Sequence, residues 1–271
     1  MIPSLPQWIT DLDARAETRR TETEGVRMTW RIWGEGEPLV LLHGGSGSWM
    51  HWARNIGPLS ARYRVIAPDL PGFGDSDLLE TASLTEYSGV IAGGLREIAP
   101  GPVRVAGFSF GSVVGLGLHG HGIDGPDYVM IGSPGLGRLH PVTEQLQKWR
   151  GRPEEERFAA HRNNVAVLML AQASSVTDEA AAIQMAHAER AVGRFRGIFK
   201  GLNWRDMLEH DGGRLMVLYG DQDALCCRYM AEREALVSSL QREAEFALLP
   251  GMGHWLAYEA ADEVNRRLLA L

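Results

Sequence analysis

The 271-residue sequence has few cysteines, no excess of basic residues and no long apolar run, and each absence excludes a class of protein. Its two cysteines, Cys226 and Cys227, are adjacent, where a structural disulfide would be strained and would cross-link nothing distant. We therefore expect two free thiols and a reducing compartment, the cytoplasm. The formal net charge of -7 gives no basic footprint for a phosphate backbone, so nucleic acid is not an expected partner.

Signals for export, membrane insertion and repeats are also missing. Met1 to Arg20 has no basic start followed by an apolar run and a small-residue cleavage site, so no secretion signal is visible. No apolar run approaches the roughly 20 residues that cross a bilayer, and no repeat of about 20–50 residues is present. We expect a soluble globular protein that acts on a small molecule, and no oligomeric state is predicted.

What the sequence does contain is an alternation of short apolar runs with helical segments. An alternating, half-buried strand is expected at 26–33, and the apolar runs predict buried strands at 39–42, 63–67, 103–106, 128–131, 215–219 and 245–249. Helices are expected at about 4–19, 49–61, 85–98 and 256–269, and directly after residue 109. This alternation specifies βαβ crossovers and therefore an α/β protein with a mainly parallel, doubly wound sheet.

The alternation lapses between residues 137 and 212. This stretch holds helical segments at 153–171 and 177–195 but no convincing strand, so we expect a helical cap at 137–212, inserted into a core made of residues 1–136 and 213–271. The large apolar side chains of this stretch would either pack the cap's own core or form the underside of a lid over a pocket; they are Trp149, Met169, Met185, Phe199 and Trp204.

The segment Gly107-Phe108-Ser109-Phe110-Gly111 follows the β-branched run at 103–106 and precedes a small-residue helical stretch. This context of strand, turn and helix is typical of a nucleophile elbow, which exposes a serine hydroxyl at the carboxyl edge of a parallel sheet. Glycine two positions before and after the serine removes the Cβ atoms that would keep the chains apart. Since the spacing also arises by chance, its surroundings decide whether Ser109 is a nucleophile.

A serine nucleophile needs a base and an acid, and both have candidates. His254 follows the last predicted strand, at the same sheet edge as Ser109, so it is the candidate base. Asp221 and Asp223 follow the strand expected at 215–219, and either carboxylate could orient His254 or cap the next helix. The order serine, acid, histidine along the chain is that of α/β hydrolases.

On these motifs the sequence resembles α/β-hydrolase-fold enzymes, in the serine-nucleophile branch with a helical cap, over nearly its whole length from Val26 on. The matching segments are His43-Gly44-Gly45, Pro68 to Ser76, Gly107 to Gly111, Gly220 to Asp223 and Gly253-His254. The resemblance implies an α/β-hydrolase fold in which Asp223 is the acid, with Asp221 as the fallback. It also implies an oxyanion hole made by the backbone N–H groups of Phe110 and Gly45, with His43 bracing the loop.

We therefore expect a serine hydrolase that cleaves a small, largely apolar carboxylic ester or related acyl compound through an acyl-enzyme, without a cofactor. A serine at position 109 excludes the branch of the fold that uses an aspartate nucleophile. Two alternatives remain, which are hydrolysis of a carbon–carbon bond in a diketo acid and a non-catalytic ligand-binding member of the fold. The His119-Gly120-His121 pattern lacks the spacing of a metal array, so no metal is expected.

Large side chains beside the motifs and in the cap suggest an apolar acyl or aryl pocket, although aromatic residues near a sheet edge commonly belong to the core. The candidates for this pocket are Trp49, Trp52, Trp149, Trp204, Met252 and Trp255.

Overall fold

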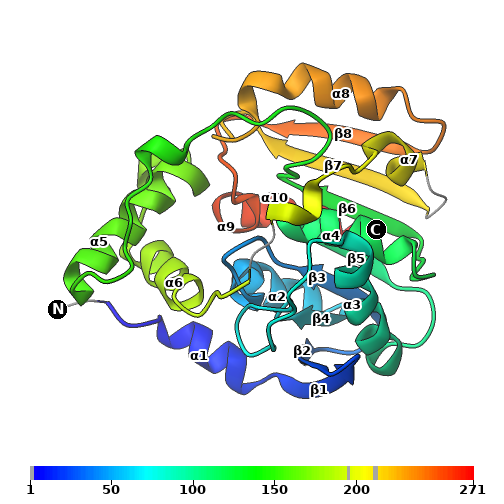
Figure 1. Cartoon of the computed structure of the whole chain (residues 1–271), viewed down its shortest axis with the longest axis horizontal. Helices are drawn as coiled ribbons and strands as arrows, with labels where there is room; N and C mark the ends of the chain where they lie inside the picture. The colour runs from blue at the N-terminus through cyan, green and yellow to red at the C-terminus, as the bar shows by residue number, and fades with distance from the viewer. Residues whose placement is uncertain (1–2, 194–195, 210–212) are drawn as a thin grey trace.

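The computed structural model describes residues 3–193, 196–209 and 213–271, and in this part of the chain one eight-stranded sheet organises the molecule (Figure 1). The strand order is β1-β2-β4-β3-β5-β6-β7-β8, in which β3 to β8 pair in parallel and the β1–β2 and β2–β4 pairs are antiparallel. The strands are β1 (Glu17–Thr23), β2 (Val26–Trp33), β3 (Glu37–Leu42), β4 (Tyr63–Pro68), β5 (Arg104–Phe108), β6 (Asp127–Ile131), β7 (Arg214–Gly220) and β8 (Ala244–Leu249).

Helices connect these strands and cover the sheet. They are α1 (Gln7–Ala14), α2 (Ala53–Ser60), α3 (Leu84–Ile98), α4 (Phe110–His119), α5 (Glu154–Asn164), α6 (Asp178–Ala188), α7 (Trp204–Glu209), α8 (Met230–Ser238), α9 (Leu256–Glu259) and α10 (Ala261–Leu269). The expected mainly parallel α/β sheet is confirmed. Because successive side chains of a strand point to opposite faces, Leu39 and Leu41 join the apolar cluster beside α2 and α10, whereas Val40 and Leu42 join the cluster beside α3 and α4.

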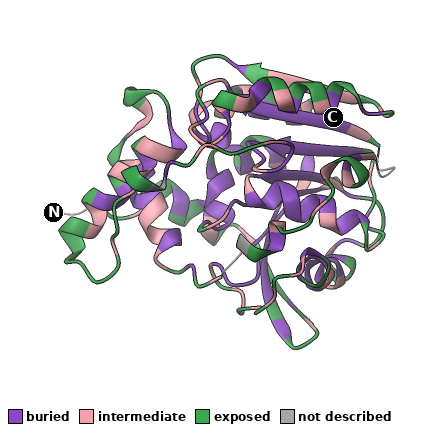
Figure 2. Cartoon of the chain, turned by 45° about the horizontal axis from the view of Figure 1, so that its top comes forward, coloured by how far each residue is buried: buried purple, intermediate pink, exposed green. Residues whose placement is uncertain are grey.

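Figure 2 shows the central strands buried throughout, while the peripheral helices expose their outer faces. The side chains of Leu39, Val40, Leu41 and Leu42 are each 0% exposed, as expected for a strand that helices cover on both sides. Among the described residues, no helix combines the length and the apolar character needed to cross a bilayer.

The first strand was not expected from the sequence. The helix predicted to reach Arg19 ends at Ala14, and residues 17–23 form β1, which pairs antiparallel with β2. Its sequence, ETRRTET, has no apolar alternation because this edge strand is held by the backbone ladder and mostly faces solvent. One inward contact is made by Thr21, whose hydroxyl accepts a hydrogen bond of 2.9 Å from the Trp30 indole.

Several predicted helices are divided or shortened. The helix expected at 49–61 begins as a 3-10 turn at Trp49–Trp52 and continues as α2, and the terminal helix is divided into α9 and α10 at Ala260. The helix expected at 153–171 consists of α5 followed by a π-helical turn at Val165–Met169. The helix expected at 177–195 ends at Ala188, and the last two positions of that prediction, Arg194 and Phe195, lie outside the described residues.

The segment expected to form the cap has two parts in the structure. Helices α5 and α6 pack against each other on one side of the sheet, whereas α7 packs against α4 beside β7 (Figure 1). Residues 194–195 and 210–212 of this segment lie outside the described residues. The division into a core and a cap at 137–212 therefore stays a prediction.

Candidate active site

Ser109 lies between β5 and α4 in a strained backbone conformation. Its φ of 50° and ψ of -117° fall in a region that L-residues with a Cβ rarely adopt. Two backbone hydrogen bonds hold the turn, because the Ser109 N–H donates to the Ile131 carbonyl at 2.8 Å and the Ser109 carbonyl accepts from the Ser112 N–H at 3.0 Å. The turn therefore projects the Ser109 hydroxyl from the carboxyl end of β5.

Glycine is needed at both flanking positions for steric reasons. A Cβ at position 107 would lie 2.5 Å from the Ser112 backbone nitrogen, and one at position 111 would lie 2.3 Å from the Leu42 carbonyl oxygen. Both distances are shorter than any normal contact, so a side chain at either position would displace α4 from the sheet.

Ser109, His254 and Asp223 form a continuous chain of hydrogen bonds. The Nε2 atom of His254 is 3.0 Å from the Ser109 Oγ, and its Nδ1 is 2.7 Å from an Asp223 carboxylate oxygen. The other carboxylate oxygen of Asp223 accepts from the backbone N–H groups of Leu225 (2.9 Å) and Cys226 (3.1 Å). Because an ionised carboxylate only accepts, Nδ1 carries the histidine proton and Nε2 presents its lone pair to the serine.

The loops that follow β7 and β8 bring the acid and the base to the serine. Asp223 is 0% exposed and His254 is 2% exposed, so water does not compete for the hydrogen bond between them. The alternative acid, Asp221, instead accepts a hydrogen bond of 2.7 Å from the Gly251 N–H. The structure thus brings Asp223, and not Asp221, to His254.

The two residues expected to supply oxyanion donors lie beside Ser109. Phe110 is the first residue of α4, where a backbone N–H has no acceptor within the helix, and the positive end of the helix dipole points at the same place. Gly45 lines the same cavity as Ser109 and Phe110. His43 holds the Gly44–Gly45 loop, since its Nδ1 donates to the Gly44 carbonyl at 2.8 Å while its Nε2 accepts from the Leu70 N–H at 2.9 Å.

Asp69 is part of the loop that supports this edge of the sheet. One of its carboxylate oxygens accepts from the Trp49 N–H at 3.1 Å, and the other accepts from the Asp75 N–H at 3.0 Å and from the Arg31 guanidinium at 2.9 Å. These contacts use both carboxylate oxygens, so Asp69 holds this loop in place.

A cavity of about 610 Å³ opens above the Ser109 hydroxyl and contains His254 in its wall. Its wall is mainly apolar, and much of that apolar wall comes from residues 137–199, namely Leu139, Val142, Leu146, Trp149, Leu168 and Phe199. Among the described residues that line the cavity, Arg150 alone has a permanent charge; its guanidinium donates to the Ala191 carbonyl at 3.0 Å and lies over the Trp149 ring.

Of the six residues predicted to form the pocket, Trp149 lines this cavity. The structure places the other five elsewhere. Trp49, Trp52, Trp255 and Met252 belong to or pack on the apolar cluster beside α2, and Trp204 packs on the cluster on the opposite face of the sheet. Large indole rings bury most apolar area in the core, and a position next to a motif in the sequence does not turn the side chain toward the cavity.

Four polar side chains from residues 137–193 line the cavity and were not singled out from the sequence. Besides Arg150, they are His161 and Asn164 on α5 and Gln184 on α6. The spacing of three residues between His161 and Asn164 places both on one helix face, but nothing in the sequence indicates that this face is turned toward Ser109. Burial lowers the pKa of His161, whose ring centroid lies 4.9 Å from that of Trp149.

Histidine, cysteine and acidic side chains are the usual protein ligands of metal ions. No group of three or more histidine, cysteine, aspartate or glutamate side chains in residues 3–193, 196–209 and 213–271 is arranged to hold a metal ion. In the His119-Gly120-His121 segment, the His121 ring is bonded to the Thr85 carbonyl at 2.8 Å.

The fold and this site define a class of protein, and comparison with known proteins agrees. Residues 39–267 match the model of the alpha/beta hydrolase family, and the chain belongs to that family. A relative from Pseudomonas putida, the dihydrolipoyllysine-residue acetyltransferase component of the acetoin cleaving system, is 30% identical over 93% of this chain and 68% of its own length. The 2-hydroxy-6-oxo-6-phenylhexa-2,4-dienoate hydrolase of Burkholderia cepacia is 28% identical over 87% of each chain.

Solved structures show the same fold. The carboxylesterase CesB from Bacillus subtilis superposes with a TM-score of 0.73 over 97% of this chain and 95% of its own, at 17% sequence identity. This superposition shows a shared fold, and at such low sequence identity it says nothing about the substrate.

Proposed function

We propose that this hydrolase cleaves a small, largely apolar carboxylic ester or related acyl compound through an acyl-enzyme. Ser109 Oγ attacks the carbonyl carbon while His254 takes its proton. His254 then returns that proton to the leaving alcohol as the ester bond breaks. Water, activated by the same histidine, releases the acid and regenerates the serine, and Asp223 holds His254 in the required tautomer throughout.

The observation that carries this proposal is the hydrogen-bond chain from Ser109 through His254 to Asp223 at the base of a mainly apolar cavity. A chain of this kind lowers the cost of removing the serine proton, and an apolar cavity favours an uncharged acyl group. The N–H groups of Phe110 and Gly45 supply the oxyanion hole in this proposal, where one donor is worth about 2.7–4 kcal/mol of transition-state stabilisation.

The segment 137–212 acts in this proposal as the cap that selects the substrate. This role is supported by the cavity wall, since much of its apolar surface comes from that segment. The two cysteines are free in the structure, which supports the expectation of a reducing compartment, the cytoplasm.

The proposal is tested with short-chain aryl esters and the Ser109→Ala variant. Turnover should fall by about 10⁴-fold or more while the circular dichroism spectrum and melting temperature stay close to those of the parent. Labelling by a serine-reactive fluorophosphonate tests the non-catalytic alternative, because a ligand-binding protein without an activated serine would not be labelled. Equal turnover in the parent and in Ser109→Ala would overturn the assignment.

One observation favours a second candidate, hydrolysis of a carbon–carbon bond in a diketo acid. The Arg150 guanidinium carries a permanent charge in the cavity wall and could pair with a substrate carboxylate. A relative is named as a hydrolase of 2-hydroxy-6-oxo-6-phenylhexa-2,4-dienoate, which is such an acid. In that reaction water adds across the bond beside the ketone, and two acids result.

The two candidates differ in their response to Arg150→Gln. If the substrate is a dienolic diketo acid, the parent should prefer it to aryl esters, and the variant should raise KM for the acid by about 10-fold or more. If the substrate is a neutral ester, KM should stay within about 2-fold of the parent value. Leu139→Ala, a change in the apolar wall, is the control, because it should affect both substrates alike.

A further inference from the structure

His51 contacts the loop that holds the proposed oxyanion donor. It lies in the 3-10 turn Trp49–Trp52, is 2% exposed, and its Nδ1 accepts a hydrogen bond of 3.1 Å from the Gly44 N–H. The His51 ring packs against the backbone of Gly47, where a Cβ would lie 2.2 Å from the His51 Cε1 and would clash with it. The imidazole is therefore packed directly against the backbone of the loop that carries Gly44 and Gly45.

Two histidines form hydrogen bonds with the two backbone polar groups of Gly44. His51 accepts from its N–H, and His43 donates to its carbonyl at 2.8 Å. The carbonyl of Gly44 and the N–H of Gly45 belong to one planar trans peptide unit and point in opposite directions. Because His43 fixes the direction of the Gly44 carbonyl, it also fixes the Gly45 N–H in the opposite direction. The His51 contact fixes the direction of the Gly44 N–H.

The tautomer of His51 follows from this contact. An imidazole nitrogen that accepts carries no proton, so the single proton of the neutral ring sits on Nε2. The ring is neutral because burial, followed by the neighbouring His187, lowers the pKa of His51 well below its ordinary value. Among the described residues, the buried Nε2 has no hydrogen-bond partner, which leaves one unsatisfied donor.

His187 on α6 presents the complementary atom. Its Nε2 lies 3.1 Å from the side-chain oxygen of Gln184, so Nε2 carries the proton and Nδ1 is an acceptor. That Nδ1 is also buried, and it has no partner in the part of the chain that the structure describes. The rings of His51 and His187 lie with centroids 4.5 Å apart, so an unsatisfied donor and an unsatisfied acceptor belong to adjacent buried rings.

We propose that His51 and His187 act as positioning residues, forming a relay that runs from Gln184 in the cavity wall through both imidazoles to the Gly44 N–H. This proposal rests on the proposed function, since the relay aligns the Gly45 N–H toward the oxyanion that forms on Ser109 attack. It couples α6, and with it the wall that meets the substrate, to the loop that stabilises the transition state.

The relay has a spectroscopic signature that requires no turnover. In protein labelled with ¹⁵N-histidine and assigned by single substitutions, His51 and His187 should both be neutral, each with its proton on Nε2. Finding the His51 proton on Nδ1, or either ring as imidazolium at neutral pH, would overturn the proposal. A protein that shows the expected tautomers but hydrolyses no ester would contradict the proposed function and leave the relay standing.

The kinetic test compares two substitutions of His51. Asparagine can place an acceptor oxygen near the position of Nδ1, whereas phenylalanine keeps the ring shape and removes the acceptor. His51→Phe should lower kcat by about 10- to 100-fold with KM within about 2-fold, less than the roughly 10²- to 10³-fold effect of deleting a donor. His51→Asn should recover kcat to within about 5-fold of the parent.

A second kinetic experiment tests whether His187 acts through His51. His187→Phe should lower kcat by about 3- to 10-fold, and the double variant His51→Phe, His187→Phe should be no slower than His51→Phe alone. Effects that simply multiply, or a change confined to KM, would overturn the relay. His121→Phe, remote from the cavity, is the control for replacing a histidine and should keep kcat unchanged.

Discussion

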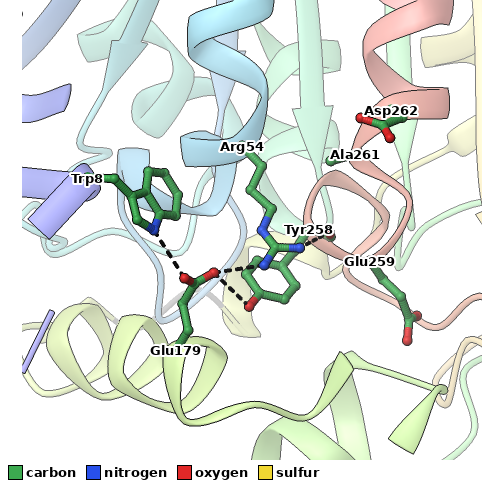
Figure 3. Close-up of a pocket in the computed structure, with 7 residues that line it drawn as sticks. All are labelled: Trp8, Arg54, Glu179, Tyr258, Glu259, Ala261 and Asp262. Atoms are coloured by element: carbon green, nitrogen blue, oxygen red, sulfur yellow. Dashed lines mark hydrogen bonds and ion pairs between the residues drawn. The ribbon is translucent and has the colours of Figure 1, made fainter. Parts of the chain in front are cut away.

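Two hollows in this protein have similar volumes, about 610 Å³ above Ser109 and about 520 Å³ beside Glu179, but they use their polar groups in opposite ways. In the second hollow, Trp8, Arg54 and Tyr258 all point toward the Glu179 carboxylate (Figure 3). They donate hydrogen bonds of 3.1, 2.7 and 3.1 Å to it, and Arg54 also stacks 3.6 Å from the Tyr258 ring centre. The charges of Arg54 and Glu179 are thus already matched within the protein.

The cavity above Ser109 has the opposite character. Its wall is mainly apolar, and its polar members include the Ser109 hydroxyl held on a strained turn and Arg150, which has no carboxylate beside it among the described wall residues. The comparison teaches that the size of a hollow does not identify a site. A guanidinium without a carboxylate partner among the described wall residues and a hydroxyl beside His254 are available to a substrate, whereas the groups around Glu179 join α1, α2, α6 and α9 to one another.

The largest expected effect contrasts the two acids that follow β7. Asp223→Asn should lower kcat by about 10³- to 10⁴-fold, because an amide cannot hold His254 in the tautomer that accepts the serine proton. Asp221→Asn, the matched control, should leave kcat within about 3-fold, since this carboxylate bonds to the Gly251 N–H. Steady-state kinetics on an aryl ester measure both, and comparable losses in the two variants would refute the assignment of Asp223.

The next effect contrasts Glu179 with His187, a buried histidine on the helix that also carries Gln184 of the cavity wall, in their response to acid. Burial lowers the pKa of His187 to about 3. Between about pH 6.5 and pH 3 the unfolded chain binds a proton there that the folded chain does not, so His187 costs stability as the pH falls. At pH 5 this amounts to about 2 kcal/mol, at roughly 1.4 kcal/mol per pH unit below pH 6.5. Replacing it with asparagine should reduce the fall in melting temperature between pH 7 and pH 5.

Glu179 should behave in the opposite manner. Burial by itself raises the pKa of its carboxyl, but the hydrogen bonds from Arg54, Trp8 and Tyr258 more than offset this and hold the pKa below its ordinary value. Its contribution to stability is therefore complete above about pH 4.5 and is lost as the pH falls through the folded pKa. Glu179→Gln should leave the change in melting temperature between pH 7 and pH 5 as in the parent. If this change became smaller in Glu179→Gln but not in His187→Asn, the two assignments would be contradicted.

A smaller effect compares one tryptophan from each hollow. Trp149→Ala removes apolar wall above Ser109, so kcat/KM for an aryl ester should fall by about 10-fold, mainly through a higher KM. Trp8→Ala changes the hollow beside Glu179 and should keep kcat/KM within about 2-fold. If Trp8→Ala impaired the reaction as much as Trp149→Ala, the cavity above Ser109 would not be the substrate site.

The smallest effect concerns stability at neutral pH. Glu179→Gln weakens a partly exposed network, so it should cost about 0.5–1 kcal/mol, or about 1–4 °C in melting temperature, with kcat unchanged. A calorimetric scan beside an activity assay measures both. Altered kcat without a change in melting temperature would assign this hollow a part in the reaction.

The sequence was most informative where chemistry and local backbone demands coincide. The elbow at Ser109 and the loop carrying His254 were recognisable because a strained turn requires glycine at fixed positions and because parallel strands bring their carboxyl ends to one edge. The choice between Asp221 and Asp223 came from the family resemblance, and the structure brings Asp223 to His254 at 2.7 Å.

Features that depend on tertiary packing could not be predicted. The polar strand β1 has no apolar pattern, because the backbone of β2 holds it in place. Trp52 and Trp255 were candidates for the pocket, yet both are 0% exposed in the core, since proximity in sequence does not fix the direction of a side chain. His51 and His187 are 136 positions apart and carry no motif, so only the fold could bring their rings together.

The central claim is that Ser109 is an activated nucleophile within reach of His254, and covalent labelling tests it most directly. Treatment of the native protein with a fluorophosphonate, followed by peptide mass spectrometry, should give one adduct on the peptide that contains Ser109 and none in Ser109→Ala. His254→Ala should slow this labelling strongly. Failure of the native protein to react, or an adduct on a different serine, would contradict the account.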